Sequence, residues 1–201
     1  MLEEFARPPG AAPLKFDVLM SLRSATSALH TRLDARLPIA RADASLHDYV
    51  AHLRVLRPWL LGLREALAGH GPALDAVARH VDAKLADLEQ DLAQAGDAGP
   101  ADVPVATGRR AGDSETPGFA WGLAYVVEGS QLGGAVLHRR LRERLAPHAL
   151  RYLAGSEEKV AARWRDFVHR LRRTVVDESG LRQAQHGAVA GFEDLVRRFG
   201  L

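Results

Sequence analysis

The 201-residue chain contains no cysteine, which excludes disulfide bonds and metal sites built on thiolates. It also lacks an apolar run close to the roughly 20 residues that a membrane-spanning helix needs. The N-terminus is acidic and rich in proline, unlike the basic and then apolar start of a secretory signal peptide. These absences favour a cytoplasmic protein without a membrane span.

A strong charge of one sign is missing as well. The 27 lysines and arginines stand against 25 aspartates and glutamates, so the net charge is only +2. Two arginine-rich clusters, residues 139–144 and 163–173, alternate with apolar residues as solvated helix faces do. A nucleic-acid-binding domain usually carries a larger, one-sided basic excess, so we expect no nucleic acid partner.

Several catalytic motifs do not occur. The chain has no Glu-x-x-His, His-Glu-x-x-His, Walker A or Gly-x-Ser-x-Gly sequence, and no Gly-x-Gly-x-x-Gly after a strand. These absences argue against a ferritin-like di-iron bundle, a zinc protease, a nucleotide-binding P-loop, a dinucleotide-binding fold and an α/β-hydrolase.

What the sequence does contain is helical periodicity. Apolar residues recur at three- and four-residue intervals in six segments, which are Leu14–Leu37, Ser45–Gly69, Pro72–Gln94, Thr116–Pro147, Ser156–Gly180 and the part after Gly180. No strand and no repeat is evident. We therefore predict an all-α fold of about six helices in a single domain, residues 14–201. We expect residues 1–13 to be a disordered tail and residues 96–117 to form a loop.

The fourth predicted helix contains an unusual amount of glycine. Gly129, Gly133 and Gly134 interrupt its apolar pattern, and each costs about 1 kcal/mol relative to alanine in a helix interior. Two explanations are open. Small residues one turn apart allow another helix to approach closely, or a flat ligand lies directly on the helix backbone. The glycines taken alone favour close packing.

His30 is the histidine of most interest. It falls at the edge of the apolar face of the first predicted helix, with Arg23 seven residues earlier on the same side. Such a histidine is commonly a boundary residue, but a neutral imidazole there could also bind a metal or a haem iron. Arg23, ~10 Å away by helical rise, could then meet a carboxylate of a large planar ligand. Arg165 and His169 share one edge of the fifth helix in a similar way.

Two segments together resemble the haem oxygenase family. Residues 22–34, Leu-Arg-Ser-Ala-Thr-Ser-Ala-Leu-His-Thr-Arg-Leu-Asp, resemble the proximal helix of that family. Residues 125–134, Tyr-Val-Val-Glu-Gly-Ser-Gln-Leu-Gly-Gly, resemble the distal helix of its small bacterial members. The order and spacing of the segments match, and the resemblance extends loosely from about residue 18 to the C-terminus.

The resemblance implies a role for each matching residue. His30 would be the proximal ligand of the haem iron, and Gly129, Gly133 and Gly134 would line the distal side. The remaining implied haem contacts are Arg23, Tyr125, Arg165, His169, Phe192 and Phe199. Ser130 departs from the pattern, because many family members carry an aspartate there that organises water. A serine can hold a water by hydrogen bonds but supplies no carboxylate.

The activity implied by the resemblance is oxidative ring opening of haem to biliverdin, with release of ferrous iron and carbon monoxide. Haem would be both cofactor and substrate. Electrons would come from a separate ferredoxin, flavodoxin or reductase, and a bilin-using photoreceptor could take the product. Two alternatives stay open: a haem-binding or haem-sensing protein of the same fold without turnover, and a helical module without haem whose glycines serve packing.

Overall fold

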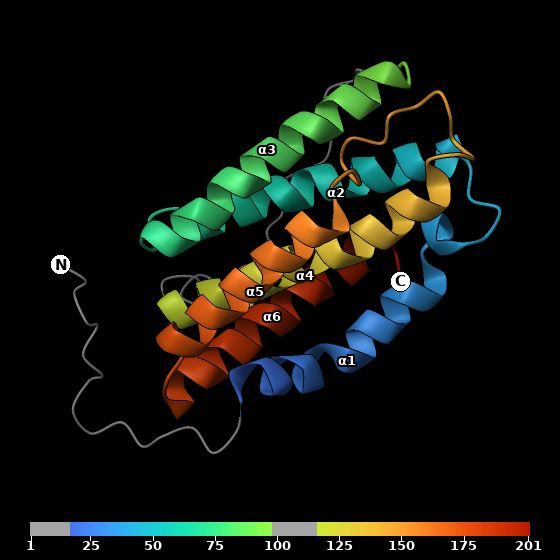
Figure 1. The fold of residues 1–201 in the computed structure, drawn as a ribbon. Coiled ribbons are helices and arrows are strands. Elements are labelled where there is room, and N and C mark those ends of the chain that lie inside the picture. The colour runs from blue at the N-terminus through green and yellow to red at the C-terminus, as the bar shows by residue number, and fades with distance from the viewer. Residues whose placement is uncertain (1–16, 98–115) are drawn as a thin grey trace.

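Helices are the only regular elements in the computed structural model, which describes residues 17–97 and 116–201. They are α1 (Val18–Arg36), the short 3-10 helix η1 (Pro38–Ala40), α2 (Leu46–Leu67), α3 (Pro72–Gln94), α4 (Pro117–Leu141), α5 (Glu157–Thr174) and α6 (Glu178–Arg198) (Figure 1). The prediction of an all-α fold is confirmed. The predicted tail 1–13 and most of the predicted loop 96–117 lie outside the described residues.

Side-chain caps determine where the helices begin. Ser45 and Asp48 form a capping box at α2, in which each side chain accepts a hydrogen bond from the other residue's backbone N–H, at 3.3 Å and 2.8 Å. Thr116 caps α4, and Pro117 takes the first helical position, where its missing N–H costs nothing. The predicted starts of these two helices are therefore confirmed.

Two predicted boundaries are wrong. Gly180 does not separate the last two helices but lies in the first turn of α6, where its N–H donates to Asp177 Oδ1 at 2.7 Å. This N-cap bond satisfies a backbone donor that would otherwise be orphaned, and it outweighs the low helix propensity of glycine. At the other boundary, α4 ends at Leu141 rather than continuing to Pro147.

α4 and α6 form the centre of the fold and interlock through glycines. A Cβ added to Gly122 of α4 would lie 2.0 Å from the carbonyl oxygen of Ala184, and one added to Gly187 of α6 would lie 2.1 Å from that of Phe119. No side chain fits at either position. Further along both helices, Gly191 of α6 contacts Val126 of α4. Later residues of α4 thus contact later residues of α6, so the two helices run parallel.

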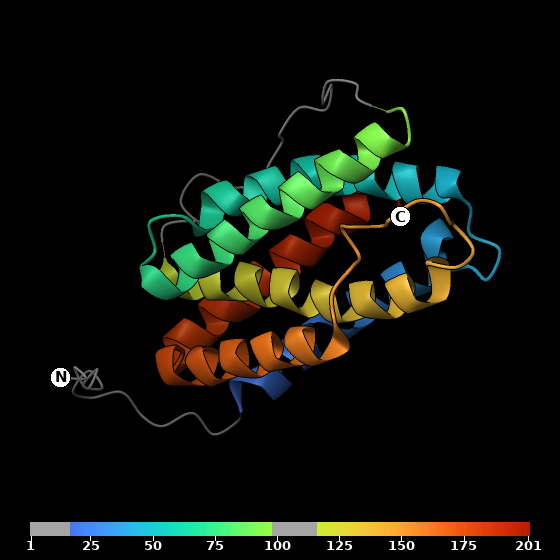
Figure 2. The same cartoon turned by 45° about the horizontal axis from the view of Figure 1, so that its top comes forward.

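After Gly191, residues of α6 contact α1 and α2. The ring of Phe192 lies against His30 of α1, and Phe199 stacks on His52 of α2. The Trp59 indole N–H donates to the carbonyl of Gly191 at 3.2 Å. α2 and α3 pack together on one side of α4, and α5 lies along another side (Figure 2). The C-terminal half of α4 is therefore left without the α6 packing that covers its first half.

Candidate functional site

His30 and Phe192, two residues predicted to lie near the same ligand, meet in the structure. Their ring centroids are 5.9 Å apart. A second neighbour of the His30 ring is Asp34, whose Oδ2 lies 2.9 Å from His30 Nδ1. The His30 side chain is 62% exposed. Because Nδ1 faces a carboxylate, Nε2 is the nitrogen left to bind a metal, and the carboxylate fixes the ring orientation.

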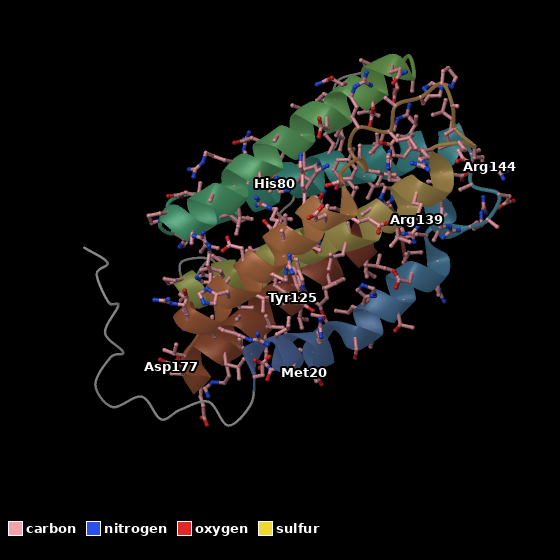
Figure 3. All side chains as sticks on the ribbon, viewed as in Figure 1. Met20, His80, Tyr125, Arg139, Arg144 and Asp177 are labelled. Atoms are coloured by element: carbon pink, nitrogen blue, oxygen red, sulfur yellow. The ribbon has the colours of Figure 1, made fainter. Side chains whose placement is uncertain are left out.

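α1 and α4 run in the same direction (Figure 1) and are joined near their C-terminal ends. Arg140 of α4 donates to the carbonyl oxygen of Ala40 at 2.8 Å, just after α1. Arg144 donates to the three consecutive carbonyls of residues 42–44 at distances between 3.1 and 3.3 Å. Figure 3 shows Arg144 beside this connection. The segment that follows α1 is thus bound to the end of α4.

His30 and Gly133 each lie about two turns before the end of their helix. His30 precedes Arg36, the last residue of α1, by six residues, and Gly133 precedes Leu141, the last residue of α4, by eight. Since α6 packs against both helices, the imidazole and the glycines are placed on two helices held side by side through a third.

Gly129, Gly133 and Gly134, here called the glycine face, do not bring the backbone of another helix into close contact. Among the described residues, a Cβ at Gly133 would meet no atom within 4 Å. A Cβ at Gly129 would lie 3.8 Å from the Trp164 ring, and one at Gly134 would lie 3.7 Å from the Leu153 side chain. These are ordinary contacts. Close backbone packing therefore occurs at glycines nearer the start of α4, and within the glycine face Gly133 is the residue that borders open space among the described residues.

Ser130 lies within the glycine face and has its hydroxyl hydrogen engaged. Its Oγ donates to the carbonyl of Val127 at 2.7 Å and accepts from Gln131 Nε2 at 3.3 Å. Gln131 also shares a hydrogen bond with the phenol of Tyr152, whose pKa is raised by burial. Ser130 can accept a further hydrogen bond, for example from water, but it donates within its own helix.

α5 supports the other side of the glycine face. Glu128, 2% exposed, accepts hydrogen bonds from Arg163 through both carboxylate oxygens. Burial raises the pKa of Glu128, and the bonds from Arg163 oppose that shift. The next residue, Trp164, covers Gly129 and packs on Tyr125, with ring centroids 5.8 Å apart. Tyr125 is thus buried between α4 and α5 (Figure 3), and its contact with a ligand stays a prediction.

Arg165 and His169 are exposed on α5. Arg172, two turns after Arg165, pairs with Asp17 at the start of α1 at 2.7 Å, so this flank of α5 faces α1. Within the described residues, no carboxylate pairs with Arg23 or Arg165. The structure does not bring Arg165 or His169 into contact with His30, and their roles stay predictions.

The residues present fit haem in kind. They include one imidazole with a nitrogen that does not face Asp34, open space at Gly133, and two exposed arginines, Arg23 and Arg165, without a carboxylate partner among the described residues. The family model described as Heme oxygenase matches residues 17–199.

The chain belongs to the haem oxygenase family. A curated heme oxygenase from Xanthomonas campestris pv. campestris (strain 8004) is 42% identical over 74 residues, which are 36% of this chain and 44% of that protein. The match therefore spans less than half the length of that relative. The crystal structure of the NO- and CO-bound heme oxygenase from Neisseria meningitidis aligns with a TM-score of 0.68, covering 92% of this chain and 94% of that chain at 21% identity. This likeness supports the all-α haem oxygenase fold.

The contacts of several residues near the candidate site were not predicted from the sequence. Asp34 lies four residues after His30, a spacing that places the two on one helix face. Glu128 follows five apolar residues, Leu123–Val127, and a carboxylate in such a run signals burial with a partner. The hydrogen bonds from Arg140 and Arg144 to residues 40–44 could not be predicted from local sequence, because their acceptors are backbone carbonyls about 100 residues away.

No helix among the described residues is long and apolar enough to cross a membrane.

Proposed function

We propose that the protein is a haem oxygenase that opens the haem ring to biliverdin and releases ferrous iron and carbon monoxide. One observation carries the proposal. Gly133 of the glycine face borders open space among the described residues, and its helix α4 runs in the same direction as α1, which carries His30. The family membership supports the same reading.

His30 would hold the iron through Nε2, while Asp34 keeps the imidazole oriented. Bound haem supplies the iron centre at which oxygen is activated, and its own ring is the substrate. The glycine face lets the ring approach the backbone of α4 and places no acidic or basic side chain above it. Gly129, Gly133 and Gly134 would therefore supply no strong general acid beside a bound haem, and such an acid is what cleavage of the peroxidase type would need.

Arg23, Arg165 and His169 would bind the two haem carboxylates. Two other arginines on α5 already form ion pairs, Arg163 with Glu128 and Arg172 with Asp17. Arg23 and Arg165 have no such partner among the described residues, so they are available for an anionic ligand. A charge-assisted hydrogen bond to a carboxylate is about twice as strong as a neutral one.

The electrons would come from an external ferredoxin, flavodoxin or reductase, because the sequence has no flavin or nicotinamide motif. The reaction would take place in the cytoplasm. A photoreceptor that binds bilins is one consumer that would fit the product.

A second candidate is a haem-binding protein without turnover. Ser130 favours it, because its hydroxyl hydrogen is donated to the carbonyl of Val127 and no carboxylate stands there to organise water. A hemin titration followed by a reductant in air separates the candidates. A Soret band and then biliverdin absorption are expected. A Soret band without biliverdin would support the second candidate, and no Soret band would refute both.

A further inference from the structure

Glu128 immediately precedes the glycine face, and its side chain is almost completely buried, with 2% exposed. Its Oε2 accepts from Nε of Arg163 at 2.7 Å, and its Oε1 accepts from Nη2 of the same guanidinium. This bidentate geometry fixes orientation as well as distance, because a planar guanidinium matches a carboxylate in only one arrangement. The pair therefore ties α4 to α5 at the start of the glycine face.

Few other contacts hold the start of the glycine face, whereas the end of α4 is bound to residues 40–44 through Arg140 and Arg144. The interlock with α6 ends near Val126, where the Cβ of a substituted Gly191 would meet the valine side chain at 3.3 Å. Helices normally fix their register through side-chain ridges that fit into grooves, and glycines have no such ridges. Gly129 contacts the Trp164 ring, and Gly133 has open space around it.

The pair of Glu128 and Arg163 is not expected to contribute much to stability. Burying the Glu128 carboxylate costs desolvation energy, and the Arg163 side chain is 36% exposed, so solvent screens the attraction. Glu128 also lies about 140° around the helix from Gly133, so its carboxylate faces α5 and does not reach the open side. An orienting role accounts for the pair where a stabilising role does not.

We propose that Glu128 and Arg163 are positioning residues that set the height and tilt of the glycine face above the haem plane, and thereby select the edge of the ring that is oxidised. This inference rests on the function proposed above. The pair contacts neither haem nor iron, and it acts through the backbone of residues 129–134.

Two variants and one control test the proposal. Glu128→Gln keeps the shape of the side chain and removes its charge. The double variant Glu128→Leu with Arg163→Met replaces the pair by apolar side chains of similar size, and it covers the case in which the single variant folds poorly. Glu157→Gln is the matched control, because Glu157 pairs with Arg139 and also joins α5 to α4, but these side chains are 61% and 60% exposed and such pairs contribute little.

The first measurement is amide hydrogen exchange of the haem-free proteins. In both pair variants, amides of residues 129–137 are expected to exchange about tenfold faster than in the parent, because local opening depends on local contacts. Amides of residues 118–126 and the whole control variant are expected to match the parent. The double variant is expected to melt no lower than the parent. Parent-like exchange at residues 129–137, or an equal increase in all helices, would overturn the proposal.

The second measurement is the ratio of biliverdin isomers from hemin-loaded protein with a reductant. The pair variants are expected to give a broader mixture than the parent, while Glu157→Gln gives the parent ratio. An unchanged ratio despite faster exchange would overturn the selection of the ring edge. A parent that makes no biliverdin would refute the proposed function, and the exchange data would still decide whether the pair positions the glycine face.

Discussion

Nδ1 of His30 lies 2.9 Å from Oδ2 of Asp34, one turn further along α1. Both side chains are more than half exposed, at 62% and 68%, so the pair contributes little to the stability of the fold. Its effect is on the imidazole, because a carboxylate on one ring nitrogen fixes the ring and makes the other nitrogen a better metal ligand.

Asp34→Ala is therefore expected to weaken hemin binding about tenfold while leaving the melting temperature of the haem-free protein within about 2 °C of the parent. A Soret titration and a thermal melt measure the two effects. Asp166→Ala is the control, since it removes an exposed pair of the same spacing, with Arg170 on α5. Equal hemin affinity in the parent and both variants would remove Asp34 from the site.

The glycines of α4 separate into two kinds, and substitutions distinguish them. Gly122→Ala is expected to destabilise the haem-free protein strongly, because its Cβ would lie 2.0 Å from the carbonyl oxygen of Ala184. Gly133→Leu is expected to keep or raise stability, by up to ~1 kcal/mol from helix propensity, because a Cβ there meets nothing within 4 Å. The same leucine is expected to abolish hemin binding or turnover.

Thermal melts without haem and Soret titrations measure both variants. Overpacking of a filled site typically costs ~1–3 kcal/mol, so a destabilised Gly133→Leu that still degrades haem normally would show that the glycine face serves packing. Such a result would leave His30 and the family membership as the support for a ligand site.

Arg23→Glu is expected to weaken hemin binding about tenfold, which corresponds to ~1.4 kcal/mol, because it replaces a carboxylate partner by a like charge. It is also expected to change the biliverdin isomer ratio. Arg79→Glu on α3 is the control, since Arg79 is exposed and also has no carboxylate partner among the described residues. The same loss of affinity in both variants would indicate a general charge effect.

Acid is expected to destabilise the protein through His52. Burial lowers the pKa of His52 to about 4, and its Nδ1 is buried with no hydrogen-bond partner in the described part of the chain. Between pH 6.5 and 4 the unfolded chain binds a proton that the folded state does not, so stability falls as the pH falls through that window. His52→Leu is expected to flatten this dependence.

His80 adds a second component of the same sign, because burial, helped by Arg163 and Lys84, lowers its pKa to about 4 as well. Melting temperatures of the parent and His52→Leu at pH 7, 5.5 and 4.5 give the comparison. If the two curves stay parallel, His52 does not titrate with unfolding.

The sequence predicts the helices and the two halves of the site because both depend on local patterns. Helical periodicity and caps such as Ser45 and Thr116 are encoded within a few residues, and His30 and the glycine face lie in segments that resemble one family. The distinction between Gly122 and Gly133 was not predictable, because it depends on where α6 leaves α4. That divergence follows from tertiary packing at Gly187 and Gly191.

The partner of the buried Glu128 carboxylate could not be predicted from the sequence either. Glu128 could be recognised as a carboxylate in an apolar run, but its partner Arg163 lies 35 residues away on another helix. For Arg165 and His169 the local arrangement could be predicted but a tertiary contact is not seen. The sequence predicts that they share one edge of a helix, and the structure leaves both side chains exposed and without contact to His30.

Biliverdin formation by hemin-loaded protein with a reductant in air, measured side by side for the parent, His30→Ala and His47→Ala, tests the central claim most directly. His47 is an exposed histidine outside the site and serves as the control. The account predicts biliverdin from the parent and His47→Ala, and none from a folded His30→Ala. Biliverdin from His30→Ala at the parent rate, or none from the parent, would contradict it.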